Sequence, residues 1–206
     1  MPPADVPRIA ELVADMRTVI IECHPRLVGA RCVDFARRLR GELHVAMGLE
    51  TVHPEVLHRL NKQMTLDDFA RATDIILEHG MSARAFILLC PPLLDEEEGV
   101  EWAMRSVEWA FAHGVECCVV IPTRAGNGAM EELARQGLFA PPSLASLERA
   151  LAEGIRMARG RVFADLWNIE ALASCPECGP ARAERLRRMN LEQVVPPGVS
   201  CARCEA

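Results

Sequence analysis

Residues 44–51 read HVAMGLET, a run in which apolar side chains alternate with small or polar ones. If the run is a strand, Val45, Met47 and Leu49 point to one face, and the other face carries small groups and the acid Glu50. Strands of a parallel sheet that is covered on both faces usually read as continuous apolar runs. A polar face with a glycine therefore indicates a covered sheet that leaves room for a ligand. The alternative is an amphipathic edge strand whose polar face lies in water.

Helix and strand patterns alternate on both sides of this run. Helices are predicted around residues 9–16, 32–39, 54–60, 66–77, 100–111, 130–136 and 143–157, and strands at 18–21, 84–90, 116–121 and 161–167. The alternation predicts an α/β fold with a parallel sheet, either curved with helices outside or open with helices on its faces. Ligands gather at the carboxyl ends of such strands, so Glu22 and Glu50 could bind an amine or act in acid–base chemistry. A strand-end carboxylate can also simply be solvated.

The bulk composition fits one large domain, or one domain with a small appendage. The 206 residues are 50% hydrophobic and carry a formal net charge of −6, which argues against a generally basic nucleic-acid surface but not against a local basic patch. No apolar run reaches the roughly 18 residues of a membrane span. The N-terminal residues also lack the hydrophobic stretch of a signal peptide. With nine cysteines, an odd number, these features predict a cytoplasmic protein that does not contact a membrane.

The composition changes near residue 169. We therefore expect residues 1–168 to form the α/β unit and residues 169–206 to form a small appended module. A predicted helix in this module carries four arginines that could contact RNA phosphates: Arg182, Arg185, Arg187 and Arg188. The alternative is a solvated helix face whose charge balances the acidic body.

Two C-x-x-C pairs flank that helix. Cys175 and Cys178 form the first pair, and Cys201 and Cys204 form the second. Such pairs can place four thiolates around a tetrahedral zinc or around an iron–sulfur cluster, and the sequence leaves both open. Because four thiolates leave no open coordination position, we expect a structural metal site. Unpaired free thiols are the alternative.

Four short motifs follow one another along the chain. They are Ile21-Glu-Cys-His-Pro25, Gly48-Leu-Glu-Thr51 with Asn61-Lys62 downstream, Arg84-Ala-Phe-Ile-Leu-Leu-Cys-Pro-Pro92, and Val120-Ile-Pro-Thr123. In order and spacing they resemble the radical SAM superfamily, in the branch shared by the Elongator catalytic subunit and the radical SAM subunit of archaeosine synthase. The likeness spans residues 5–204 and includes the cysteine-paired tail with its basic helix.

This resemblance implies a partial (β/α) barrel of the radical SAM type with S-adenosylmethionine (SAM) in its mouth. Gly48, Glu50 and Thr51 would line the methionine or ribose side of SAM. Glu22 would lie close to its amino acid or ribose, and Pro122-Thr123 would lie near its adenine.

The cysteines depart from the family pattern at one point that matters for the chemistry. Radical SAM enzymes hold a [4Fe–4S] cluster on a C-x3-C-x2-C loop after the first strand, and the nine cysteines here have no such spacing. We therefore expect the C-terminal part of an enzyme, as a truncated gene product, a fragment or half of a split protein, which does not make the radical alone. Missing strands would leave an open sheet edge, through which the chain could associate, for example with a missing N-terminal half.

The resemblance implies a full-length parent that cleaves SAM to a 5′-deoxyadenosyl radical and acts on a modified tRNA base or a related substrate. The alternative belongs to another class. It is a non-catalytic accessory protein that keeps the half-barrel as a scaffold and uses the zinc-containing tail to hold RNA or a partner.

Overall fold

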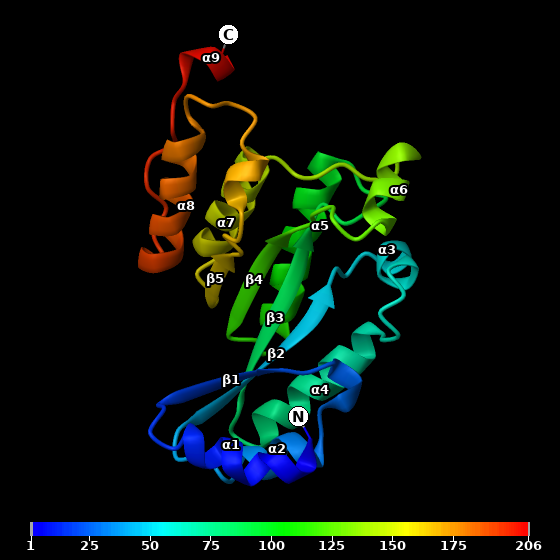
Figure 1. The fold of residues 1–206 in the computed structure, drawn as a ribbon, viewed down its shortest axis with the longest axis vertical. Coiled ribbons are helices and arrows are strands. Elements are labelled where there is room, and N and C mark those ends of the chain that lie inside the picture. Colours follow the sequence, from blue (N-terminus) through cyan, green and yellow to red (C-terminus); the bar gives the residue numbers. More distant parts are fainter. Residues whose placement is uncertain (1, 206) are drawn as a thin grey trace.

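The computed structural model describes residues 2–205, and its helices and strands alternate as the sequence predicts (Figure 1). The strands are β1 (Thr18–Glu22), β2 (Glu42–Glu50), β3 (Ser82–Leu89), β4 (Cys117–Pro122) and β5 (Arg161–Ala164). The α-helices are α1 (Val6–Leu12), α2 (Ala30–Ala36), α3 (Pro54–Arg59), α4 (Leu66–Glu78), α5 (Glu96–Ala112), α6 (Ala129–Arg135), α7 (Leu144–Arg156), α8 (Gly179–Glu192) and α9 (Ala202–Glu205). Short 3-10 helices are η1 (Pro3–Asp5), η2 (Pro25–Leu27) and η3 (Ile169–Leu172). In the described part of the chain, no helix is both long enough and apolar enough to cross a membrane.

The five strands form one parallel sheet in the order of the chain, β1-β2-β3-β4-β5. The predicted α/β fold with parallel strands is therefore confirmed. β1 and β5 are the two edges, and β2 pairs with β1 on one side and with β3 on the other. The alternative of an edge strand for residues 44–51 is therefore wrong.

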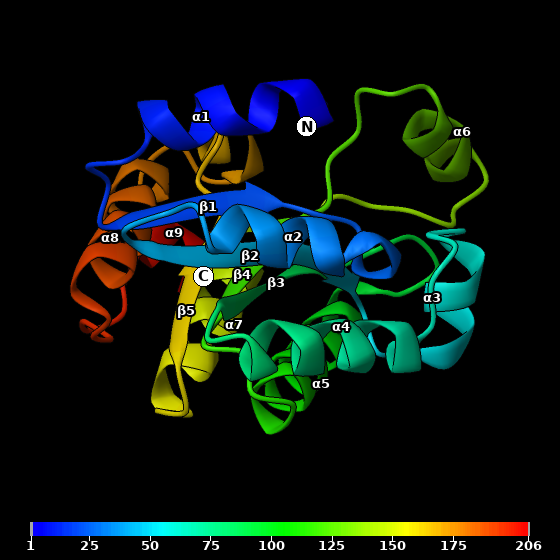
Figure 2. The ribbon, with the colours of Figure 1, turned by 90° about the horizontal axis from the view of Figure 1, so that it is seen from below.

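One face of the sheet packs against helices α4, α5 and α7 and forms the hydrophobic core. Figure 2 shows α4 and α5 together on this side of the sheet. On β2, the side chains of Val45, Met47 and Leu49 belong to this core and are each 0% exposed. On the other face His44 and Gly48 are partly buried but Ala46 and Glu50 are buried, so the predicted alternation is seen in burial only in part.

The opposite face of the sheet is less covered. Residues in register on neighbouring parallel strands point to the same face. The register aligns one row of partly buried residues across four strands: Gly48, Phe86, Val119 and Phe163. We call this surface the open face.

The outer edge of β5 is occupied by amide side chains of the α8 segment. Asn190 Oδ1 accepts a hydrogen bond from the Ala164 amide at 2.8 Å, and Asn190 Nδ2 donates to the Ala164 carbonyl at 2.8 Å. Gln193 Oε1 likewise accepts a hydrogen bond from the Val162 amide at 3.0 Å, and Gln193 Nε2 donates to the Val162 carbonyl at 2.9 Å. These are the backbone groups that a further strand would use, so the two amides block strand addition at this edge.

The outer edge of β1 has no such cap. Within residues 2–205 no strand pairs with it, and Ile20 on this strand is 52% exposed. The edge of the sheet that stays available for strand pairing is therefore the one at β1.

Helix α8 of the tail packs into the same core as the sheet. Ala183, Leu186 and Met189 are 2%, 0% and 0% exposed and join the core cluster. Figure 1 shows α8 beside α7 and β5. The domain boundary predicted at residue 168 stays a prediction, but the helix beyond it shares its hydrophobic packing with the sheet.

Candidate functional site

Strand β2 ends in a turn that folds the Glu50 side chain back over the strand. Glu50 has a left-handed backbone, with φ 65°, and the pairing with β3 shifts register between Gly48 and Glu50. A non-glycine residue in this conformation is uncommon and is often found at functional sites. A Cβ atom on residue 48 would overlap Glu50 Oε1. Glycine at position 48 therefore makes room for the carboxylate of Glu50.

Lys62 supplies the partner of this carboxylate. Its Nζ lies 2.8 Å from Glu50 Oε1. The loop that presents Lys62 has left-handed residues on both sides, Asn61 at φ 53° and Gln63 at φ 55°. The loop is tied to the end of β1, because His24 Nε2 donates to the Lys62 carbonyl at 2.8 Å. The loop that carries Lys62 is thus joined to the end of β1 by the hydrogen bond from His24 and to the end of β2 by the ion pair with Glu50.

A hollow of about 290 Å³ lies between these elements on the open face. It is lined by Glu22, Cys23, His24, Pro25, Ala46, Gly48, Glu50, Lys62 and Phe86. The Glu22 side chain is exposed and has no ion-pair partner among residues 2–205. The hollow therefore holds two carboxylates and one ammonium group.

A second hollow, of about 630 Å³, continues across the open face toward β5. It is lined by Glu22, Phe86, Val119, Ile121, Ala164, Asp165, Leu166 and Asn190. Glu22 and Phe86 line both hollows, so the two form one groove with an apolar floor and a charged end at β1 and β2.

The structure brings three of the predicted SAM residues together and leaves the other three outside the groove lining. Glu22, Gly48 and Glu50 line the first hollow. Thr51 is 1% exposed, and its Oγ1 accepts from the His53 amide at 3.1 Å, which caps the turn before α3.

Pro122 and Thr123 lie where β4 ends. Pro122 is paired with Leu89 of β3, and the Thr123 amide donates to the Leu89 carbonyl at 3.0 Å. Thr123 Oγ1 is buried without a hydrogen-bond partner among the described residues. A buried hydroxyl without a partner is uncommon in proteins. The expected role of these two residues near an adenine stays a prediction.

The four tail cysteines converge. Their Sγ atoms all lie within 4.8 Å of one another, with Cys175 and Cys201 at 4.0 Å and Cys178 and Cys204 at 3.7 Å. Backbone amides of Cys178 and Glu177 lower the pKa of Cys175 from 9.0 to about 7. Hydrogen-bond donors that favour a thiolate also favour a metal ligand. The four cysteines could therefore bind a metal ion.

The spacing of these sulfur atoms can be compared with the geometry that each of the two metal centres left open by the sequence requires. A tetrahedral zinc with Zn–S bonds of about 2.3 Å places its sulfurs about 3.8 Å apart. A four-iron cluster spreads its thiolates over four separate irons and holds them further apart. Two of the separations are 3.7 and 4.0 Å, and all four sulfurs lie within 4.8 Å of one another, so one ion could bind them all; the choice between zinc and a cluster stays a prediction.

The other five cysteines do not fit a cluster. Among residues 2–205, the tail cysteines are the only group of three or more possible ligands that lie close enough for one metal. Burial, and after it the nearby Cys32, raises the pKa of Cys23 to about 11. Cys23 is therefore a protonated thiol at neutral pH. We derive no chemical step through a [4Fe–4S] cluster on this chain.

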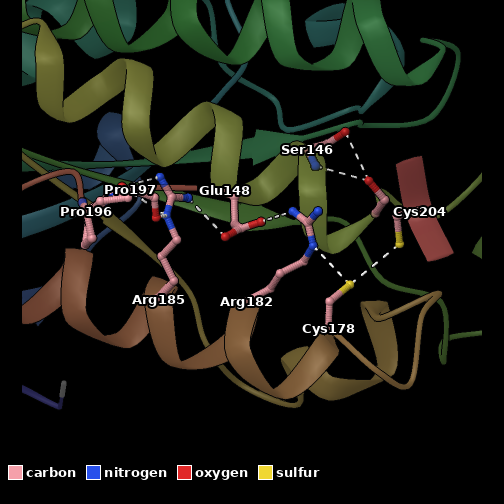
Figure 3. A network of polar contacts seen from close by, with 9 residues as sticks. Ser146, Glu148, Cys178, Arg182, Arg185, Pro196, Pro197 and Cys204 are labelled. Atoms are coloured by element: carbon pink, nitrogen blue, oxygen red, sulfur yellow. Dashed lines mark hydrogen bonds and ion pairs between the residues drawn. The ribbon is translucent and has the colours of Figure 1, made fainter. Parts of the chain in front are cut away.

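Two of the four predicted RNA-contacting arginines are engaged inside the protein (Figure 3). Glu148 on α7 is 4% exposed and forms ion pairs with both Arg182 and Arg185, the latter at 3.0 Å. Arg182 Nε also donates to Cys178 Sγ at 3.4 Å. A buried carboxylate needs such partners, so these two arginines hold the tail against α7.

The other two arginines face solvent. The Arg187 side chain is 47% exposed and pairs with Glu170, and that of Arg188 is 55% exposed and pairs with Glu192. Exposed ion pairs are worth little and exchange partners readily. The predicted RNA contact stays a prediction, and Arg187 and Arg188 are the two of the four residues that are free to make it.

Lys62 was not among the residues expected at the site, although it lies in the Asn61-Lys62 motif downstream of Gly48-Leu-Glu-Thr51. One signal could have found it: Lys62 is the only lysine in a chain with 23 lysines and arginines in total. Phe86, which forms the apolar floor, alternates with buried residues on β3 and could have been found from the strand pattern.

Comparison with known proteins finds relatives among curated sequences. No family model matches the chain. The chain is 34% identical over 106 residues to archaeosine synthase subunit beta of Thermococcus kodakarensis, covering 48% of this chain and 33% of the relative. It is 25% identical over 198 residues to the protein of the same name from Methanosarcina acetivorans, covering 91% of this chain and 56% of the relative. The chain thus spans from a third to about half of the length of these curated relatives.

Two solved structures share the fold. The archaeal Methanocaldococcus infernus Elp3 with an N-terminal deletion matches with a TM-score of 0.63 and 14% identity, covering 91% of this chain and 44% of that chain. Coproporphyrinogen III oxidase (HemN) from Escherichia coli, described as a radical SAM enzyme, matches with a TM-score of 0.53 and 18% identity, covering 76% of this chain and 37% of that chain. In both, the match covers less than half of the other protein.

Proposed function

Because the chain is related to the radical SAM superfamily, we propose that its open face is the SAM-binding part of a radical SAM barrel. One observation carries the proposal. Glu22, Glu50 and Lys62 meet in one hollow at the carboxyl ends of two neighbouring parallel strands. This is where ligands bind in α/β proteins of both the open and the barrel kind.

The charges of the hollow suit SAM. SAM carries an ammonium, a sulfonium and a carboxylate group. Glu22 and Glu50 complement the two cationic groups, and Lys62 complements the carboxylate. The ammonium and the carboxylate of SAM can form charge-assisted hydrogen bonds, which contribute about 1.5–3 kcal/mol each, whereas the sulfonium has no hydrogen to donate and is attracted to a carboxylate by charge alone. The ribose hydroxyls could donate hydrogen bonds to Glu22 or Glu50, whichever of the two does not bind the ammonium group.

The protein's own part in the reaction is then to bind and orient. Lys62 and Glu50 hold the amino-acid end, and the apolar floor at Phe86 excludes water from the groove. When bound together, SAM and a reduced [4Fe–4S] cluster supply the radical chemistry, and the residues of this chain do not fit the cluster. We propose that cluster ligands come from a segment outside residues 1–206 or from another chain, and that this chain alone makes no radical.

We propose a modified tRNA base as the substrate class of the complete enzyme. The support is the sequence similarity to the two proteins named archaeosine synthase subunit beta. The odd number of cysteines and the two C-x-x-C pairs, which suit metal binding better than a disulfide framework, support a reducing compartment, for which we propose the cytoplasm. The exposed edge of β1 is the surface through which the rest of the sheet would join.

We propose zinc as the metal of the four tail cysteines. The sulfur separations support one ion with four thiolate ligands, and such a site has no open position for catalysis. Its role would be to fold the tail.

Two experiments test the main proposal. Sequencing of the reading frame upstream of Met1 should reveal an in-frame C-x3-C-x2-C motif. Anaerobic reconstitution of the chain with iron, sulfide, reductant and SAM should yield no 5′-deoxyadenosine. Formation of 5′-deoxyadenosine would mean that cysteines of this chain do hold the cluster. A stop codon directly upstream would instead favour a non-catalytic accessory protein, which the lack of a C-x3-C-x2-C motif in this sequence also allows.

A further inference from the structure

We infer that the four-cysteine centre and the amide cap on β5 form one cooperative unit, so that metal binding sets one wall of the ligand groove. The inference rests on the proposal that the four cysteines bind a metal. It concerns residues that the metal does not touch.

Arg182 joins the first cysteine pair to the body of the protein. Its Nε donates to Cys178 Sγ at 3.4 Å, and its Nη1 pairs with Glu148 on α7. Figure 3 shows the guanidinium between the sulfur and the carboxylate. A metal-bound thiolate is a stronger acceptor than a thiol, so metal binding strengthens this bridge.

Glu148 also reaches the segment that leads to the second cysteine pair. Arg185 Nη1 lies 3.0 Å from Glu148 Oε1. The same guanidinium donates to the carbonyls of Pro196 and Pro197, each at 2.9 Å. Both arms that carry the cysteines are therefore fastened to one buried carboxylate, which is 4% exposed.

Helix α8 carries the effect from the cysteines to the sheet. It begins at Gly179, directly after Cys178, and it holds Asn190 near its other end. With a rise of 1.5 Å per residue, Asn190 lies about 18 Å from Cys178 along the helix axis. Asn190 caps Ala164 on β5 and also lines the groove with Phe86 and Ile121. If the metal centre fixes the first turn of α8, it also fixes the position of the Asn190 side chain at the groove.

Coupling between two sites is reciprocal, so a change at Asn190 must alter metal affinity. The zinc dissociation constant would be measured by competition with a chromophoric chelator for wild type, Asn190→Ala, Arg182→Gln and Arg188→Gln. We expect Asn190→Ala to weaken zinc binding several-fold and Arg182→Gln to weaken it by about 10- to 100-fold, the usual effect of losing a group that orients a metal ligand. Arg188 lies on the same helix, but its one ion-pair partner among residues 2–205 is Glu192, so Arg188→Gln should match wild type.

A second readout uses the wild-type protein alone. Zinc should slow hydrogen exchange at the Val162 and Ala164 amides relative to protein treated with chelator, because those amides bond to Gln193 and Asn190. Equal zinc affinity of wild type and Asn190→Ala, together with exchange that does not respond to zinc, would overturn the coupling. Wild type that binds no zinc would instead refute the metal proposal on which the coupling rests. If Asn190→Ala does not fold, Gln193→Ala and the wild-type exchange data give the same test.

Discussion

Lys62 Nζ lies 2.8 Å from Glu50 Oε1 at the carboxyl end of β2, and every other fixed cation in the chain is an arginine. An ammonium group is a compact point charge, whereas a guanidinium is a planar fork that prefers paired acceptors. The groove therefore has a small positive centre beside a carboxylate that is turned back over Gly48. A ligand with an ammonium and a carboxylate close together, such as an amino acid group, can place its ammonium beside Glu50 or its carboxylate beside Lys62.

Gly48→Ala should break the Glu50–Lys62 pair, because the added Cβ overlaps the Glu50 carboxylate. Lys62 is the only lysine, so amine-directed labelling followed by peptide mass spectrometry reports on this one side chain. The contact with Glu50 restricts the approach of a reagent to the Lys62 amine, and we expect labelling of Lys62 to speed up several-fold in Gly48→Ala and in Glu50→Gln. Glu42→Gln, on the same strand, is the matched control. Equal labelling rates in all four proteins would show that the pair does not persist in solution.

The tail should bind about one zinc per chain. Elemental analysis of the purified protein measures the content directly, and Cys178→Ser should abolish it. Because metal binding is coupled to folding of the tail, removal of the metal with a chelator should lower the temperature of unfolding. Protein that contains neither zinc nor iron would rule out the metal centre. Detection of iron and sulfide in place of zinc would show that the cysteines hold an iron–sulfur cluster.

Stability should fall in alkaline solution, in part because of Cys90. Burial, and after it the charge of nearby Glu96, raises the pKa of Cys90 from 9.0 to about 12. Between these two values the unfolded chain loses a proton that the folded chain keeps, so the contribution of Cys90 is present below pH 9 and is lost as the pH rises toward 12. The loss is up to about 1.4 kcal/mol per pH unit. Denaturant unfolding of wild type and Cys90→Ala from pH 8 to 10.5 should give a shallower decline for the variant, and parallel declines would contradict this assignment.

The arginines of α8 should divide into two classes. Charge reversal at Arg187 and Arg188 should weaken RNA binding and make its salt dependence shallower, with little change in unfolding free energy. Arg185→Glu should instead destabilise the fold by about 3–5 kcal/mol, because it leaves the buried Glu148 beside a like charge. Filter binding at several salt concentrations and denaturant unfolding measure the two effects. Unchanged RNA affinity in the Arg187 and Arg188 variant would assign those residues to a solvated face.

Much of the fold could be predicted because its signals are local. The alternation of Val45, Met47 and Leu49 on one face of β2 reports directly which side of the strand is buried. The same pattern could not tell an interior strand from an edge strand, since that depends on pairing with β1 and β3, which lie far away in the sequence. The last strand is shorter than predicted, since it ends at Ala164 and not at residue 167.

The site was predictable in part, for the same physical reason. Glu22 and Glu50 follow from their places at strand ends. The Glu50–Lys62 contact does not, because it depends on two left-handed residues that flank Lys62. The four arginines of the tail look alike in sequence, and only the packing of α8 on α7 separates Arg182 and Arg185 from the exposed pair.

The central claim is that the hollow at Glu22, Gly48, Glu50 and Lys62 binds SAM, and ligand-detected NMR tests it most directly because it registers weak binding without a cluster. Saturation-transfer spectra of SAM would be recorded with wild type, Gly48→Ala, Glu50→Gln and the control Glu42→Gln. We predict transfer to the methionine and ribose protons of SAM with wild type and the control, and a clear loss of it with Gly48→Ala and Glu50→Gln. Absence of transfer with wild type, or equal transfer with all four proteins, would contradict the account.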